Sequence, residues 1–265
     1  MSRFAPSLNI KDDPQCLMTS SEVITFVLIS ALFYQCNYRL TRLVISRHNY
    51  FPFLLSRSRL IRRIHQIPEI VWIVIFTVCK NFLSNKNCQS YIIDSFPVAV
   101  CQNYKIFKCK IVKGESYRGY IASKKVYFFG IKVHMLINLD GVPIEFHFTP
   151  GSISDVEGLK RFSFDLNDSS QIYADKAYND YQFEDLLLEA KNIRLVPKRK
   201  KNSKRKNSGI DDFYLSIYRN KIESVFSSIT SLMPRFIRAK TIKGFCLKVY
   251  FYILGYMMKR FSLLT

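Results

Sequence analysis

The chain has 265 residues, of which 48% are hydrophobic, and its 40 Lys and Arg against 20 Asp and Glu give a net charge of +20. This length allows one large domain or two modest ones, and the hydrophobic content excludes a disordered chain. So large a positive excess predicts a polyanionic partner, with nucleic acid as the first candidate and a membrane surface as the second.

The seven cysteines are scattered and odd in number, and no two of them form a CxxC pair. This pattern argues against a disulfide framework or a zinc ribbon, and the four histidines also lack metal-ligand spacing. The longest apolar runs, at 23–33, 70–79 and 249–258, are shorter than the roughly 18 residues that a membrane-spanning helix requires. No signal peptide is visible. We therefore expect a soluble, cytoplasmic protein with reduced thiols and no membrane partner.

Residues 1–88 are predicted to form an all-α module. Thr19 and Glu22 have the spacing of a capping box at the start of an apolar helix. A second helix is expected at 38–46, where the apolar residues have helical spacing.

The third helix of this module is predicted in the basic segment 56–65. Leu60, Ile61 and Ile64 form its apolar stripe. The arginines that lie largely outside the stripe are Arg59, Arg62 and Arg63. Three short helices, the last of them basic, suit a helix-turn-helix-like module whose final helix contacts DNA. A basic helix that packs on the rest of the chain is an equally good interpretation.

After the module the pattern changes from helical to strand-like, which predicts a domain boundary between 1–88 and 89–265. A β-branched run leads directly into Asp94. Because Pro97 cannot donate a hydrogen bond to a neighbouring strand, we expect the strand to stop near Asp94. The following segment, 102–125, is basic and aromatic and is expected to be irregular. Such a surface could stack bases or bind phosphates, and an ordinary long loop would have a similar composition.

The most regular alternation in the chain predicts a β-hairpin. Its strands lie at 128–139 and 144–148, and Asp140-Gly141 forms the turn. Lys132 and His134 fall on the polar face of the first strand. For His134 we considered a hydrogen-bonded structural role and a substrate contact.

A second carboxylate follows a buried strand in the sequence YADKAYNDY. Asp175 comes directly after this strand, and a helix is expected to start at 179–180. Carboxyl ends of strands are where open α/β sheets place their chemistry, although a strand-end Asp is also a common turn residue.

A dense basic segment follows the next predicted strand, with seven cations in the nine residues 198–206. Like charges repel and remain solvated, so this segment should be a mobile loop. It includes Lys198, Arg199, Lys200 and Lys201, and we interpret it as a nonspecific phosphate-binding loop. A loop that is merely solvated is the alternative.

The third carboxylate lies on a long helix predicted at 213–232. Glu223 is beside the apolar stripe of this helix, and Arg219 lies four positions earlier on the same face. A partly exposed Glu223 paired with Arg219 is the structural alternative to a catalytic role. An apolar helix at 245–258 closes the chain.

We interpret Asp94, Asp175 and Glu223 as ligands of two divalent metal ions, Mg²⁺ or Mn²⁺, for phosphodiester chemistry on DNA. Hard divalent cations prefer oxygen ligands, and two of them can activate the attacking hydroxyl and stabilise the leaving oxygen. Three anions repel one another, so nearby cations are expected. The candidates, which could also hold the scissile phosphate, are Lys132, Lys176 and Arg219. The order of elements resembles the ribonuclease-H-like fold, a mixed sheet flanked by helices.

Several sequence blocks also resemble one family in the right order. They are IIDSFPV, GYIASKKVYFFGIKVHMLINLDG, FTPGSISDVEGLK, YADKAYNDY and YRNKIESVFSSI. Together they resemble bacterial DDE transposases, most closely the insertion sequence 982 family within the insertion sequence 4-like group. This resemblance implies a nucleoid-associated bacterial enzyme that cleaves and joins strands at the terminal inverted repeats of its element and in target DNA. A homodimer would hold two ends, and the metal-binding triad would be Asp94, Asp175 and Glu223.

The chain departs from the broader group around the third carboxylate. That group carries a Tyr, Arg, Glu, Lys signature, and Arg219 and Glu223 fit its spacing. Ser216 stands where the Tyr would be, and Thr230 stands where the Lys would be. The strand-transfer contacts therefore stay open, as do two alternatives, a noncatalytic or decayed DNA-binding copy and a ribonuclease-H-like nuclease that cuts without joining.

Overall fold

The computed structural model describes residues 12–85, 87–121 and 124–261, and this part of the chain divides into two compact units. The helical unit comprises 12–83, 229–237 and 243–261, and the sheet unit comprises most of 84–228 with 238–242. We predicted one boundary near residue 88 and placed everything after it in a single domain. The closing helix lies instead in the helical unit. The resembling block that starts at Gly119 runs through 122–123, which lie outside the described residues.

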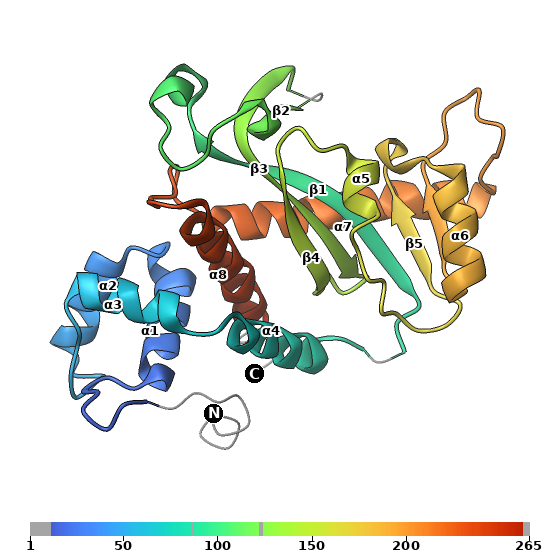
Figure 1. Ribbon diagram of the computed structural model, residues 1–265. Coiled ribbons are helices and arrows are strands. Elements are labelled where there is room, and N and C mark those ends of the chain that lie inside the picture. The colour runs from blue at the N-terminus through green and yellow to red at the C-terminus, as the bar shows by residue number, and fades with distance from the viewer. Residues whose placement is uncertain (1–11, 86, 122–123, 262–265) are drawn as a thin grey trace. The chain divides into compact units, whose positions relative to one another are not determined.

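The helical unit contains the three predicted N-terminal helices, a fourth, and the closing helix (Figure 1). Their bounds are α1 (Ser20–Tyr34), α2 (Tyr38–Arg47), α3 (Arg57–Gln66), α4 (Glu69–Leu83) and α8 (Ile242–Phe261). The predicted capping box is confirmed, because Thr19 and Glu22 exchange side-chain and backbone hydrogen bonds. Helix α8 packs through the ring of Phe251, 4.7 Å from that of Trp72.

Within the described ranges, no single helix is long and apolar enough to cross a membrane. Two bent helix pairs, α1 with α2 and α3 with α4, reach the required length and composition only when each pair is taken together.

The sheet unit is built on a mixed sheet of the order β2-β3-β1-β5-β6, with β4 paired to β3. The bounds are β1 (Ser90–Cys101), β2 (Arg118–Ile121), β3 (Val126–Asn138), β4 (Pro143–Pro150), β5 (Gln171–Ala174) and β6 (Arg194–Pro197). Strands β1, β5 and β6 are parallel, and β2, β3 and β4 are joined by antiparallel pairs. This arrangement is a mixed α/β fold, consistent with the ribonuclease-H-like sheet that we predicted.

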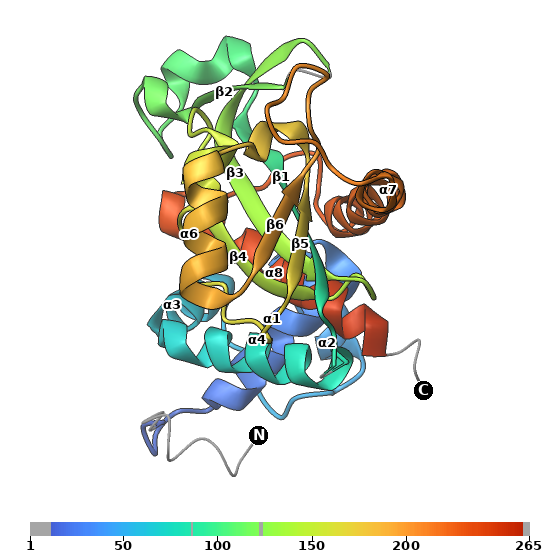
Figure 2. The ribbon, with the colours of Figure 1, turned by 90° about the vertical axis from the view of Figure 1, so that its right-hand side faces the viewer.

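Helices cover both faces of this sheet (Figure 2). On one face, α5 (Asp155–Leu159) and α6 (Tyr181–Lys191) pack on a core that includes Ile93 and Leu187. On the other face, α7 (Gly209–Ser231) packs Leu215 against Tyr173 and Val196. Because successive residues of a strand point to opposite faces, the side chain that follows Ile93 faces α7. That side chain belongs to Asp94.

The predicted hairpin is confirmed, because β3 and β4 pair around the turn at Asp140-Gly141. The predicted end of β1 is wrong: the strand continues through Pro97, opposite Lys132, to Cys101. Strand β5 pairs only with the first part of β1, up to Ile93. Beyond this point one edge of β1 is open, and an open edge tolerates a proline.

The polar face of β3 is covered, and His134 has the hydrogen-bonded structural role that we considered for it. His134 is fully buried, and its Nε2 lies 2.9 Å from Thr149 Oγ1. Its ring stacks on that of His147 on β4, with centroids 5.0 Å apart. Burial is the main cause that lowers the pKa of His134 to about 3 and that of His147 to about 4, and the positive charge of Arg161 contributes to both of these values. The pair is therefore held neutral in the folded chain.

Gly130 permits a close approach between β3 and β1. A Cβ on Gly130 would lie 2.2 Å from Val98 O, and backbone on β1 cannot yield as a side chain would. We expect Gly130→Ala to lower the free energy of unfolding by about 2 kcal/mol or more. Gly209→Ala is the matched control, because nothing lies within 4 Å of a Cβ there. Equal urea midpoints for the two variants would contradict this account.

The stacked histidines predict acid sensitivity. Their folded pKa values lie below the usual 6.5, so the unfolded chain binds more protons between pH 6.5 and 4. The free energy of unfolding should therefore fall as the pH falls through this range. We expect His147→Phe to remove about 2 to 3 kcal/mol of this pH dependence, measured by urea unfolding at pH 7 and pH 4.5. His48→Phe, at an exposed site, should behave as the unsubstituted chain does.

Candidate active site

Asp94 is the most perturbed carboxyl group of the sheet unit. It lies in the middle of β1, and its Oδ1 accepts a hydrogen bond of 2.8 Å from the Ser95 amide. Burial raises its pKa to about 7, and the negative charges of Asp155 and Asp175 add to this increase. The positive charge of Arg219 opposes it. An uncompensated carboxylate at this position is therefore costly near neutral pH, which favours a bound proton or a cation.

Asp175 lies beside Asp94 because of the strand register. Ile93 pairs with Ala174 in the parallel β1–β5 ladder, so each aspartate follows a paired residue at the same edge of the sheet. Asp175 caps the 3₁₀ turn Lys176–Tyr178, and its Oδ1 accepts a 2.8 Å hydrogen bond from the Lys176 amide. The predicted helix start after this turn is confirmed, since Asp180 caps α6.

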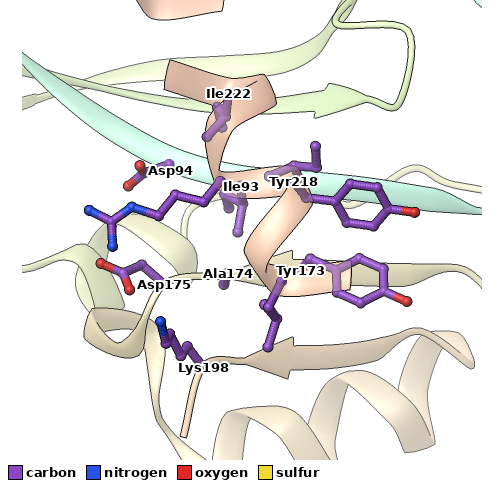
Figure 3. A pocket seen from close by; sticks show the side chains of 11 residues that line it. Ile93, Asp94, Tyr173, Ala174, Asp175, Lys198, Tyr218 and Ile222 are labelled. Atoms are coloured by element: carbon purple, nitrogen blue, oxygen red, sulfur yellow. The ribbon is translucent and has the colours of Figure 1, made fainter. Parts of the chain in front are cut away.

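Both aspartates line one pocket between the sheet and α7 (Figure 3). Asp94, Asp175 and Lys198 turn their charged ends to the same side of this pocket, and Tyr173 and Tyr218 line the other side. The two tyrosine rings meet edge to face at 4.9 Å. Arg219 completes the polar lining. The pocket thus combines two carboxylates with two cations next to an apolar wall.

Glu223 does not line this pocket. Its Oε1 lies 3.0 Å from Arg219 Nε, and both side chains are 55% exposed, which is the structural alternative that we considered. Hydrogen bonding to Glu223 raises the pKa of Arg219, and the charges of Asp175 and Asp94 raise it further. The guanidinium of Arg219 is therefore the cation that all three predicted carboxylates have in common. Among the described residues, no three His, Cys, Asp or Glu side chains are close enough together to hold a metal ion.

Two of the three predicted ligands have the donor chemistry for Mg²⁺. This cation is usually bound by one or two carboxylates, with waters and substrate phosphates completing its coordination. Asp94 and Asp175 supply such a pair, and burial, together with the negative charges of Asp155 and Asp175, raises the pKa of Asp94. The site residues therefore fit a divalent cation at Asp94 and Asp175.

A polar cluster lies near Asp94 on the opposite face of the sheet, and sequence reasoning missed it. Asp155 accepts hydrogen bonds from Ser95 Oγ at 2.7 Å and from Lys132 Nζ at 3.1 Å. Tyr178 is fully buried nearby, and burial followed by the charges of Asp94 and Asp155 raises its pKa well above the usual value. The available signal was the position of Asp155 inside the block FTPGSISDVEGLK, where we considered it only as a helix cap.

This cluster changes the interpretation of two predicted DNA contacts. Lys132 is mostly buried, with its Nζ bonded to Asp155 and to the carbonyl oxygen of Ile153. His134 presents no exposed ring, because α5 and β4 cover it. Both therefore have internal structural roles, and we withdraw them as DNA contacts.

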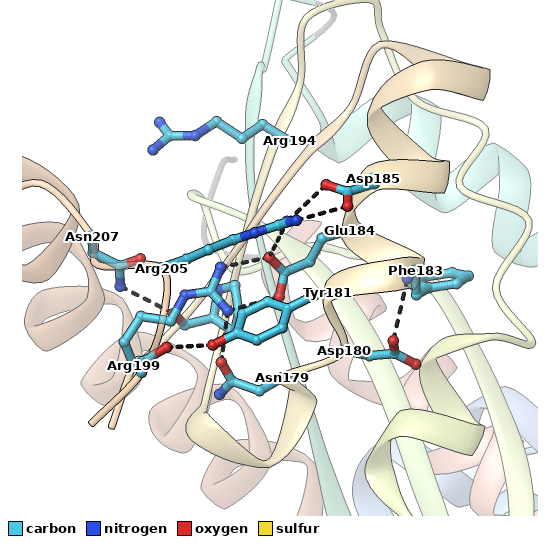
Figure 4. A network of polar contacts seen from close by, with 12 residues as sticks. Asn179, Asp180, Tyr181, Phe183, Glu184, Asp185, Arg194, Arg199, Arg205 and Asn207 are labelled. Atoms are coloured by element: carbon cyan, nitrogen blue, oxygen red, sulfur yellow. Dashed lines mark hydrogen bonds and ion pairs between the residues drawn. The ribbon is translucent and has the colours of Figure 1, made fainter. Parts of the chain in front are cut away.

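The basic loop between β6 and α7 is anchored, so our expectation of a mobile loop is wrong (Figure 4). Arg199 forms paired hydrogen bonds of 2.8 and 2.5 Å with the buried Glu184, and Arg205 pairs with Asp185. Tyr181 lies against both guanidinium groups. Arg199 is thus a structural residue that holds the loop on α6.

The lysines of the same loop are differently placed. Lys200 and Lys201 are exposed, and Lys198 enters the pocket with the aspartates. Lys200 also lines a neighbouring surface hollow together with Lys176 and Tyr181. Three of the predicted phosphate contacts, Lys176, Lys198 and Lys200, thus lie at or beside the pocket.

The predicted DNA-contacting helix, α3, divides its arginines in a similar way. Arg59 and Arg62 are exposed. Arg63 instead forms a 2.7 Å ion pair with Asp12 and a hydrogen bond to Ser20 Oγ, which fix it inside the helical unit.

Comparison with known proteins agrees with this arrangement. The family profile of the transposase DDE domain matches residues 85–235, which is more than half of the chain. Comparison with curated proteins gives no match. The matched range contains all six strands, both aspartates of the pocket and Glu223. The chain therefore belongs to the family of transposases with a DDE domain, enzymes that act on DNA.

Proposed function

We propose that this chain is a transposase of the insertion sequence 982 family that cleaves DNA at the terminal inverted repeats of its own element and joins the released ends to target DNA. The observation that carries the proposal is the position of Arg219, whose guanidinium faces Asp94, Asp175 and Glu223. Neighbouring carboxylates repel one another, so three of them stay close together only when positive charge lies between them.

Asp94 and Asp175 would hold the divalent cation, Mg²⁺ or Mn²⁺. When bound, two such ions activate an attacking hydroxyl and stabilise the leaving oxygen of an in-line displacement. The side chains of the pocket would bind the substrate and limit the access of water. Lys198 and Arg219 attract and orient the scissile phosphate, and the wall formed by Tyr173 and Tyr218 limits access of water from one side.

Glu223 would join the two aspartates after releasing Arg219. An exposed i,i+4 ion pair contributes only about 0.3 to 0.5 kcal/mol, so breaking the contact between Glu223 and Arg219 costs little. The released guanidinium could then bind a phosphate oxygen, and Glu223 could complete the metal ligand set.

DNA would lie across the carboxyl ends of the parallel strands. Lys176, Lys198 and Lys200 surround this edge, and Lys201 is exposed beside them. In the helical unit, the exposed Arg59 and Arg62 of α3 would contact the terminal repeat as part of a helix-turn-helix-like module. Two copies of the chain, each holding one element end, would form the synaptic complex.

A nuclease that cuts without joining is the second candidate. At the position where the broader group has Tyr, Ser216 donates its hydroxyl hydrogen to the carbonyl oxygen of Phe213 on its own helix. Because the Ser216 hydroxyl is used within its own helix, we infer that the strand-transfer contact of the Tyr in the broader group is lost in this chain. Transfer of a labelled element end into a target plasmid separates the two candidates.

Asp175→Asn should reduce the rate of metal-dependent cleavage by a factor of about 1,000 or more, while the affinity for DNA stays the same or increases. The physical reason is that the substitution removes both a metal ligand and a negative charge that faces phosphate. The measurement is cleavage of a labelled terminal-repeat duplex in Mg²⁺, with binding measured separately in EDTA. Asp168→Asn, an exposed carboxylate before β5, is the control and should cleave normally.

The same assay tests Glu223. Loss of cleavage in Glu223→Gln, with normal cleavage in the exposed α6 control Glu189→Gln, would place Glu223 in the catalytic set. Full activity of Glu223→Gln would mean that Glu223 serves only as the ion-pair partner of Arg219. Equal loss of binding and cleavage in Asp175→Asn would rule out the metal role.

The double substitution of Lys200 and Lys201 to Gln should weaken binding to any duplex and reduce the salt slope of log K by up to about 2. Arg199 is left intact because it anchors the loop. Lys191→Gln, at the end of α6 that leads into the amino end of β6, is the control and should leave the slope unchanged. An unchanged slope in the double variant would exclude this loop as a phosphate contact.

A further inference from the structure

A basic and aromatic surface lies beyond the pocket, in a lobe inserted between β1 and β3. This aromatic lobe comprises residues 102–121 and 124–127 of the described chain. Its framework is well ordered: β2 pairs with the start of β3, and Asn103 Nδ2 donates a 2.7 Å hydrogen bond to the carbonyl oxygen of Tyr127. Val112 is buried within the lobe, and the buried ring of Phe128, which directly follows the lobe, lies against Gly119.

Four aromatic side chains of the lobe are exposed. Phe107 is 98% exposed and Tyr104 is 74% exposed. Tyr120 and Tyr127, also exposed, face each other across the β2–β3 ladder with ring centroids 4.9 Å apart. These rings are not needed for packing. Exposed aromatic clusters of this kind mark interaction sites.

The positive charge of the lobe indicates which class of partner it binds. Its exposed lysines are Lys105, Lys108, Lys110, Lys113, Lys124 and Lys125. Glu115 is its one acidic residue and pairs with Arg118 at 3.0 Å. A second copy of this chain would bring the same positive lobe and a net charge of +20, so the charges oppose self-association here. A polyanion is favoured instead.

Aromatic rings among lysines fit single strands better than duplex. Duplex DNA presents phosphates to the lysines but hides the faces of its bases, whereas an unpaired strand offers both phosphates and base faces. The lobe offers lysines for the phosphates and rings for the bases. Lys105 Nζ already lies 5.2 Å from the centre of the Tyr104 ring, so one cation and one ring occupy the same patch.

The lobe is also placed on the correct side of the sheet. It follows the carboxyl end of β1, the edge at which Asp175 and the basic loop follow β5 and β6. Figures 1 and 2 both show β2 at the same end of the sheet unit as the loop between β6 and α7. Along β1, the strand length from Asp94 to Cys101 is about 23 Å. A strand that leaves the pocket could therefore reach the lobe within several nucleotides.

We propose that the aromatic lobe binds unpaired DNA bases next to the cleavage site, by stacking on Tyr104 and Phe107 with the lysines holding the phosphates. This inference rests on the proposed function for the identity of the DNA, but it requires neither metal nor cleavage. Binding of single strands can therefore be tested separately from chemistry.

The experiment compares the full chain with a variant that carries Tyr104→Leu and Phe107→Leu, by fluorescence anisotropy in EDTA. The probes are a labelled oligothymidylate and a blunt duplex of the same length. We expect the variant to lose between about 5-fold and 150-fold in single-strand affinity for each base that no longer stacks, with duplex affinity unchanged. Because both side chains are exposed, its urea midpoint should match that of the unsubstituted chain.

Matched variants separate stacking from simple apolar contact. Phe107→Trp keeps a ring and should retain single-strand binding, and Phe213→Leu removes an exposed ring from α7 and should have no effect. Unchanged single-strand affinity in the double variant, or equal loss on both probes, would overturn the proposal. A change in the oligomeric state measured by sedimentation, without a change in single-strand affinity, would also overturn the proposal, because it would mean that the lobe binds a second copy of the chain. Loss of cleavage in Asp175→Asn, with single-strand binding unchanged in the double variant, would refute this inference and leave the proposed function standing.

Discussion

Repulsion between neighbouring carboxylates is the constraint on which the site depends. The parallel register of β1 and β5 brings Asp94 and Asp175 to one edge of the sheet, and burial makes the charge on Asp94 costly. The positive charges that line the pocket come from elements that are remote in sequence, namely Arg219 on α7 and Lys198 after β6. The position of α7 on the sheet is thus coupled to the electrostatics of the pocket, and any ligand that enters must continue to compensate these carboxylates.

Local patterns predicted most of the architecture, because the interactions that define it are local. The capping box at Thr19 and the hairpin at Asp140-Gly141 each depend on residues within a few positions of one another. Strand β1 was predicted to be too short because the effect of Pro97 depends on which edge of the strand is paired. That edge is set by β5, more than 70 residues later, and no local signal reports it.

The candidate site was predictable only in part, for the same reason. Asp94 and Asp175 could be placed at one edge because parallel strands align their carboxyl ends. The partner of Arg199 lies on α6, so its sequence neighbourhood suggested a solvated cation where the fold largely buries it. For His134 a structural role and a substrate contact both stayed open, and its hydrogen-bond partner on β4 decides between them. Asp155 shows the reverse, since its ion pair with Lys132 arises only when α5 packs on β3. In each case a tertiary contact, and not a propensity, decided the role of the side chain.

The two carboxylates at the site contrast with the positive charge of the chain. A net charge of +20 favours DNA binding, yet the pocket sets the carboxylates of Asp94 and Asp175 beside the cations Lys198 and Arg219. The surrounding lysines attract a DNA phosphate at long range. At the pocket, the same phosphate is repelled by the carboxylates of Asp94 and Asp175. Arg219 offsets this repulsion only partly, because Glu223 occupies its Nε. Productive binding therefore requires additional positive charge between phosphate and carboxylates, which is the physical reason to expect a divalent cation at Asp94 and Asp175.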